Sequence, residues 1–96
     1  MRLRILEPAA TEAAEATVSY AAIDPTLGED FRQAIAEALE TVREAPRRQA
    51  VWRYTRRQRV VRRLLLRRFP YSVIYEIRED QVVVAAIAHW RRRPGY

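Results

Sequence analysis

Apolar and polar residues alternate near both ends of this chain, with a period of two that is typical of β-strands. Residues 1–7 set Leu3 and Ile5 between charged neighbours, which predicts a short strand with one solvated face. Residues 71–78 repeat the pattern, and residues 81–89 are so rich in valine and alanine that we expect a strand buried on both faces.

The region between these strands follows a helical period instead. Residues 9–22 are rich in alanine and follow Pro8, which can occupy the first turn of a helix. A second helix is predicted over residues 28–45, where apolar residues recur every three or four positions as one stripe. Pro25 breaks the pattern between them, and a linker of about five residues should let the two helices form an antiparallel hairpin.

The second half of the chain predicts three or four strands in succession. Residues 59–67 centre on three leucines, residues 51–54 can form a short extra strand, and Glu79-Asp80 is a two-residue hairpin loop. The element order is therefore β-α-α-β-β-β. The expected fold is α+β, a single domain over residues 1–96, with a helical hairpin packed on one face of a small, mainly antiparallel sheet.

Composition narrows the classes of protein and site. The chain of 96 residues has no cysteine and one histidine. We therefore expect no disulfide bonds, no metal site built from cysteines or several histidines, and no cofactor. The apolar residues of the first strand are interrupted by arginines, so this strand does not resemble a signal peptide. No run of the sequence approaches the roughly 18 apolar residues that span a membrane. We therefore expect a cytoplasmic protein with no membrane contact.

Charge is divided unevenly along the chain. Residues 1–46 contain four arginines and nine acidic residues, a net charge of −5, whereas residues 47–96 contain fourteen arginines and three acidic residues, a net charge of +11. There is no lysine, and the planar guanidinium of arginine suits carboxylates, phosphates and aromatic faces. This distribution favours a basic surface that meets nucleic acid or an acidic partner protein.

Two long strings in the basic half resemble a known family. Residues 62–77, RRLLLRRFPYSVIYEI, and residues 82–96, VVVAAIAHWRRRPGY, resemble toxins of the RelE/ParE superfamily, in particular its ParE-like branch. Pro8, Tyr20 and the Leu27-Gly28 opening of the second helix fit the helical half of these proteins. The resemblance implies the toxin of a bacterial type II toxin–antitoxin pair. Its partner would be a small antitoxin with a DNA-binding N-terminus and an acidic C-terminal segment.

Members of this superfamily have two activities, and the sequence favours one of them. ParE-like members inhibit DNA gyrase by binding, whereas RelE-like members are metal-independent endonucleases that cut mRNA on the ribosome. Where nucleases carry basic residues on two adjacent strands, this chain has Leu65, which can neither transfer a proton nor stabilise phosphate, and Ser72 in the place of an arginine. We therefore predict a gyrase inhibitor, not an enzyme.

The alternative is a ribosome-dependent nuclease, and its remaining candidate residues are Arg63, Arg91, Arg92, Arg93 and Tyr96. A third possibility is a plain nucleic-acid-binding module, which would bind DNA or RNA with a steep dependence on salt.

Aromatic residues among the arginines mark two candidate contact surfaces, because tryptophan, tyrosine and arginine dominate interface hot spots. Target binding is assigned to the tail, through Trp90, Arg91, Arg92, Arg93 and Tyr96. Antitoxin binding is assigned to Trp52, Tyr54, Arg62 and Arg63. The competing interpretations are a frayed basic tail for the first set and a hydrophobic cover over the sheet for the second.

Overall fold

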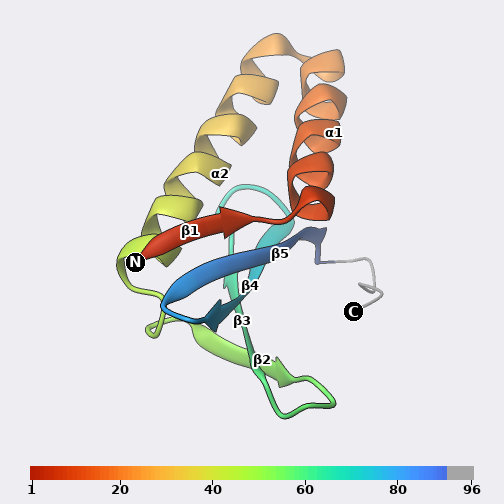
Figure 1. Cartoon of the computed structure of the whole chain (residues 1–96). Helices are drawn as coiled ribbons and strands as arrows, with labels where there is room; N and C mark the ends of the chain where they lie inside the picture. Colours follow the sequence, from red (N-terminus) through yellow and green to blue (C-terminus); the bar gives the residue numbers. More distant parts are fainter. Residues whose placement is uncertain (91–96) are drawn as a thin grey trace.

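The computed structural model describes residues 1–90 and contains two helices and five strands (Figure 1). Neither helix in this part of the chain is both long and apolar enough to cross a membrane. In chain order the elements are β1 (Arg2–Ile5), α1 (Glu7–Ile23), α2 (Pro25–Glu44), β2 (Ala50–Tyr54), β3 (Val60–Leu65), β4 (Tyr71–Arg78) and β5 (Gln81–His89).

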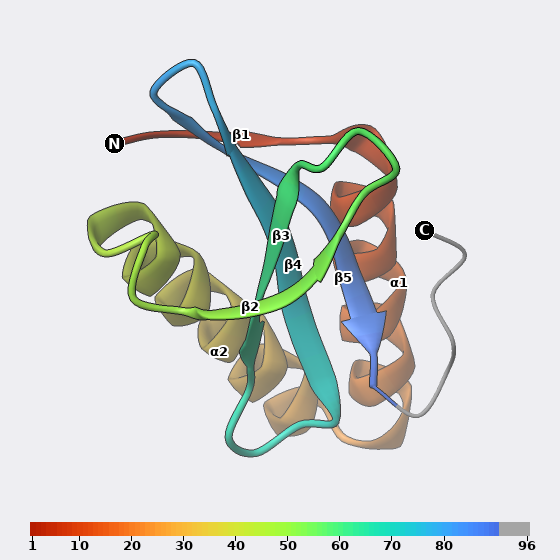
Figure 2. The ribbon, with the colours of Figure 1, turned by 90° about the horizontal axis from the view of Figure 1, so that it is seen from below.

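The five strands form one sheet in the order β1-β5-β4-β3-β2. Strand β1 pairs parallel to β5, and every other neighbouring pair is antiparallel. Both helices lie on one face of this sheet, and they are behind the strands in Figure 2. No helix of residues 1–90 covers the other face, which we call the open face. The predicted α+β architecture and its element order are confirmed, and the short extra strand is present as β2.

The junction of the two helices is shorter than the sequence predicted. Only Asp24 separates α1 from α2, because its carboxylate accepts a hydrogen bond from Thr26 N (2.9 Å) and caps a helix whose first residue is Pro25. The predicted start of the second helix at Gly28, after a linker of about five residues, was therefore wrong. Gly28 lies inside α2, where it packs against Ala21 of α1.

The core between the helices and the sheet is built from one stripe of α2 and from the inward positions of β4 and β5. Four aromatic rings lie at its centre: Phe31 has its ring centroid 5.0 Å from Tyr20, 5.1 Å from Phe69 and 5.1 Å from Tyr71. Strand β5 is an interior strand, with Val82, Val83 and Val84 all buried, as the sequence predicted. These contacts fix the helical hairpin on the sheet.

The turn between β4 and β5 takes the form that the sequence predicted. Glu79 and Asp80 both have positive φ, 49° and 62°, as a two-residue hairpin with a mirror-image turn requires. Two of the four strand pairings contain one irregularity each, at Trp52 between β2 and β3 and at Ala85 between β4 and β5. Such bulges increase local twist and redirect side chains.

Two side chains of the sheet form hydrogen bonds with the segment that joins α2 to β2. The hydroxyl of Tyr75, which is fully buried, donates to the carbonyl oxygen of Pro46 at 2.6 Å. Arg62, the neighbour of Tyr75 on β3, donates Nη1 to the carbonyl oxygens of Gln49 (2.7 Å) and Arg47 (3.3 Å). Burial raises the pKa of Tyr75 to about 12, against a smaller lowering effect of the Arg62 charge.

Tyr75→Phe tests this anchor and its pH dependence. We expect a loss of about 1 kcal/mol near neutral pH, because the Pro46 carbonyl loses its donor. The raised pKa contributes stability that is complete below pH 10, the value for the unfolded chain, and is lost as pH rises towards 12. The stability of the wild type should therefore fall more steeply than that of Tyr75→Phe between these limits, as measured by urea denaturation at several pH values. Equal slopes would contradict a buried, protonated Tyr75.

Candidate partner-binding surfaces

The open face of the sheet carries a small apolar cluster of its own. Val61, Ile74, Ala86 and Ala88 are buried there, and Trp52 packs against them from the bulge of β2. These apolar side chains form a layer beneath the arginines and aromatic residues of this face. Trp52 therefore covers apolar side chains of the sheet, which agrees with its interpretation as a hydrophobic cover.

The same tryptophan orients two guanidinium groups. Cζ of Arg53 lies 4.3 Å from the centroid of the Trp52 ring, and Cζ of Arg63 lies 5.4 Å from it. Arginine over an aromatic face is held electrostatically by the ring quadrupole. Trp52 and Arg63, two of the residues assigned to antitoxin binding, are thus brought together by the fold.

The other two residues of that set lie elsewhere. Arg62 alternates with Arg63 along β3, so its side chain faces the helix layer, where it holds the carbonyls of Arg47 and Gln49. Tyr54 is 60% exposed at the end of β2. Arg62 is therefore separated from Trp52 and Arg63, because neighbouring positions on a strand face opposite sides of the sheet.

The two departures from the nuclease pattern are direct neighbours across β3 and β4. Leu65 pairs with Ser72 in the register of the two strands. Leu65 is 51% exposed, whereas Ser72 is fully buried and donates its hydroxyl to the carbonyl oxygen of Ala88 at 3.4 Å. Beside Arg63 on this face, the chain thus has an apolar side chain and a hydroxyl bonded within the sheet, where a nuclease would have two cationic side chains.

Trp90 follows directly after β5 and is half exposed. Its backbone N–H donates to the carbonyl oxygen of Pro70 at 2.9 Å, which fixes where the chain leaves the sheet. Arg63, Leu65, Leu66 and Trp90 line a shallow hollow of ≈ 370 Å³. The other residues assigned to the target, Arg91, Arg92, Arg93 and Tyr96, lie outside the described residues.

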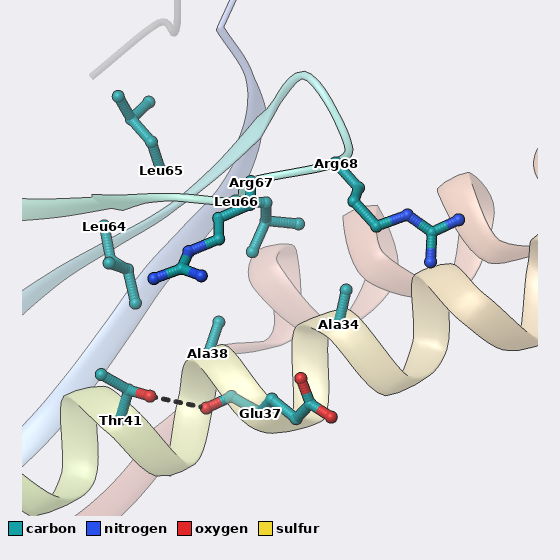
Figure 3. A pocket seen from close by; sticks show the side chains of 9 residues that line it. All are labelled: Ala34, Glu37, Ala38, Thr41, Leu64, Leu65, Leu66, Arg67 and Arg68. Atoms are coloured by element: carbon teal, nitrogen blue, oxygen red, sulfur yellow. Dashed lines mark hydrogen bonds between the residues drawn. The ribbon is translucent and has the colours of Figure 1, made fainter.

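A groove that the sequence did not predict runs between α2 and β3 (Figure 3). Its volume is ≈ 420 Å³, and we call it the α2–β3 groove. Leu64 and Leu66 point towards the helix, while Leu65 points away from it to the other side of the strand. The residues that line it are Ala34, Glu37, Ala38, Thr41, Leu64, Leu65, Leu66, Arg67 and Arg68.

The groove exists because α2 presents small side chains opposite Leu64 of β3 and Leu66, which follows it. Ala34 and Ala38 lie one turn apart, so no large side chain fills the space. Arg67 and Arg68 lie at its edge, and Arg68 pairs with Asp30 of α2 at 3.4 Å. Two sequence features could have indicated this groove. They are the pair of alanines beside the apolar stripe of α2 and the two arginines that follow a run of leucines.

The buried carboxylate of the open face belongs to Glu76. Its Oε2 accepts a hydrogen bond from Arg78 Nη2 at 2.7 Å, and its Oε1 forms an ion pair with Arg59 Nε at 2.9 Å. Within residues 1–90, no three histidine, aspartate or glutamate side chains gather where they could hold a metal ion.

Comparison with known proteins decides the family. The model for the ParE toxin of the type II toxin–antitoxin system parDE matches residues 3–94, which is nearly the whole chain. The chain belongs to the ParE toxin family. A chain of the chromosomal ParDE TA system from P. aeruginosa has a similar structure, with a TM-score of 0.77 and 20% identity over 93% of this chain and 95% of that chain. No curated protein matches.

The ParE family match confirms the predicted superfamily and the predicted branch within it. It bears on no individual residue, so the assignments of the tail to the target and of Trp52, Tyr54, Arg62 and Arg63 to the antitoxin remain predictions. Within the described chain, the α2–β3 groove is an apolar recess with a basic edge, and the open face presents arginines around Trp52.

Proposed function

We propose that this ParE family toxin inhibits DNA gyrase by binding it and that a cognate antitoxin neutralises it. The observation that carries the proposal is the family match over residues 3–94. Family membership favours gyrase as the target, and the chemistry of the open face agrees with a binding function. Leu65 and Ser72 are neighbours where a nuclease would need charged groups to activate the 2′-hydroxyl and stabilise the phosphorane.

Contact with gyrase is assigned to the C-terminal part of the chain, as the sequence suggested. Trp90 supports this assignment because it is half exposed and adjoins the hollow lined by Arg63 and Leu65. An exposed tryptophan beside arginines has the composition of an interface hot spot.

Gyrase supercoiling by purified enzyme, measured with increasing toxin, tests the target directly. We expect inhibition at micromolar toxin and a weaker effect for Trp90→Ala, by roughly tenfold or more, as for a hot-spot residue. Val18→Ala, at an apolar residue of α1 that is 69% exposed and outside the assigned surfaces, is the control and should inhibit like the wild type. Supercoiling that is unaffected at these concentrations would exclude gyrase. Cleavage of mRNA in a translating extract would then support the nuclease alternative.

The antitoxin is assigned to the α2–β3 groove. A disordered segment that folds on binding needs an apolar recess for its anchor side chains, and Leu64, Leu66 and Ala38 provide one. Arg67 at the edge of the groove would favour acidic residues in that segment. This surface adds to the predicted contribution of Trp52 and Arg63, which lie on the other face of the sheet.

Ala34→Phe separates neutralisation from toxicity. Ala34 is half-buried and lines the groove, so a phenyl ring there should fill the recess that receives the antitoxin. We expect co-expressed antitoxin to lose its ability to rescue growth, with a loss of affinity of about tenfold or more, while toxicity persists. Ala14→Phe, on the exposed side of α1, is the control and should be rescued normally. Normal rescue of Ala34→Phe would place the antitoxin elsewhere.

A further inference from the structure

The hairpin of β2 and β3 projects from the body of the molecule, and its turn lies at the opposite end from the junction of α1 and α2 (Figure 1). We call residues 50–65 the arm and residues 55–59 its tip. We propose that the arm enters the major groove of B-form duplex DNA and binds the phosphates that line it. This proposal goes beyond inhibition of gyrase and does not depend on it, because it concerns the toxin and DNA alone.

The charge of the arm is entirely positive. Residues 50–65 contain six arginines and no acidic residue. Arg56 and Arg57 are exposed at the tip, and no carboxylate of residues 1–90 pairs with either. Arg59 uses its Nε for Glu76, and its side chain remains 46% exposed. Two guanidinium groups at the tip therefore keep their donors available for phosphate oxygens.

The tip is held in one shape before any partner arrives. Thr55 N donates to the carbonyl oxygen of Arg59 (2.9 Å), and Gln58 N donates to that of Thr55 (2.9 Å). The hydroxyl of Thr55 accepts from Arg59 N at 3.1 Å. Gln58 has a φ of 63°, so the chain reverses in a tight turn. A rigid support reduces the entropy that binding costs.

The chemistry of the tip favours a nucleic acid over an acidic peptide. Residues 55–59 are Thr, Arg, Arg, Gln and Arg, so the tip itself has no apolar side chain that could anchor a peptide, and the apolar side chains of Val61 and Ile74 lie below it in the sheet. A two-stranded ribbon fits the B-form major groove, which is about 12 Å wide. The major groove of an A-form RNA helix is deep and too narrow for such an element. The geometry therefore points to DNA.

Fluorescence anisotropy of a short labelled DNA duplex, titrated with purified toxin at several salt concentrations, tests the proposal. The variant is the double substitution Arg56→Gln and Arg57→Gln. The control is Arg2→Gln and Arg4→Gln, which removes the same charge from exposed positions of β1, at the opposite edge of the sheet. We expect the tip variant to lose roughly tenfold in affinity and about 1.8 in the slope of log K against log salt, since each phosphate contact contributes about 0.9. The control should lose little.

Several outcomes would overturn the arm proposal. These are no DNA binding by the wild type at micromolar concentration, equal losses in the tip variant and the control, or equal affinity for an RNA duplex of the same length. Loss of antitoxin binding in the tip variant with unchanged DNA affinity would identify the arm as a peptide site instead. Supercoiling assays on the same proteins keep the two proposals separate. DNA binding without gyrase inhibition contradicts only the gyrase proposal, and gyrase inhibition without DNA binding by the arm contradicts only this one.

Discussion

Phe31→Ala should leave the toxin close to unfolded at physiological temperature. Phe31 is fully buried and contacts the rings of Tyr20, Phe69 and Tyr71, so its removal opens a cavity where both helices meet the sheet. Truncating a buried phenylalanine costs about 3–5 kcal/mol, which is a large part of the roughly 5–15 kcal/mol that stabilises a domain. Urea denaturation followed by far-UV circular dichroism measures the loss.

Val18→Ala is the control for this experiment. Val18 lies on α1 and is 69% exposed, so the change should alter the free energy of unfolding by no more than about 0.5 kcal/mol. A cost below about 1 kcal/mol for Phe31→Ala would mean that the aromatic cluster does not hold the helical hairpin on the sheet.

Gly28→Ala should destabilise the protein, although alanine is the better helix former. A Cβ at position 28 would lie 2.6 Å from Cβ of Ala21 and 2.9 Å from its Cα, so the two helices would have to separate. Overpacking of this kind costs about 1–3 kcal/mol, and the gain in helix propensity is at most about 1 kcal/mol. We expect the free energy of unfolding to fall by about 2 kcal/mol, near the upper end of the net range, because the added Cβ would meet the backbone of α1 and not only a side chain.

The substitution Ala21→Gly provides the matching test. It removes the Cβ that Gly28→Ala would meet, so Gly28→Ala should cost less in that background than in the wild type. The coupling is obtained from thermal or urea unfolding of the two single variants and the double variant. A stabilising effect of Gly28→Ala in the wild type would show that propensity, and not the close approach of the helices, decides the sign.

Much of the fold could be predicted because local patterns and tertiary packing agree. The alternation of residues 71–78 predicted a strand, and β4 buries Val73 and Tyr75 against the helices, but Ser72, Ile74 and Glu76 on its other face are buried as well and not solvated. The valine-rich β5 was predicted to be buried on both faces because it has few polar side chains to place in water. The helix junction was misplaced by the Leu27-Gly28 pair, since a glycine within a helix looks like a boundary when its packing partner is unknown.

The candidate surfaces were harder to predict. Arg62 and Arg63 are adjacent in the sequence and equally basic, yet one holds backbone carbonyls on the helix side and the other lies over Trp52 on the open side. The bulge at Trp52 shifts the register between β2 and β3, and it cannot be recognised from composition. The α2–β3 groove depends on alanines of a helix and leucines of a distant strand, and only the packed structure brings them together.

The sequence by itself determined the order of the elements, the segregation of charge and the family, because these depend on periodicity, composition and motif strings. The tertiary structure decided which arginines are used internally and which remain exposed, and where apolar residues leave a recess. Those properties depend on contacts between residues far apart in the chain, such as the bond between Tyr75 and Pro46 and the close approach of Gly28 to Ala21. Burial and hydrogen bonding of an individual side chain are set by such contacts and not by its neighbours in the sequence.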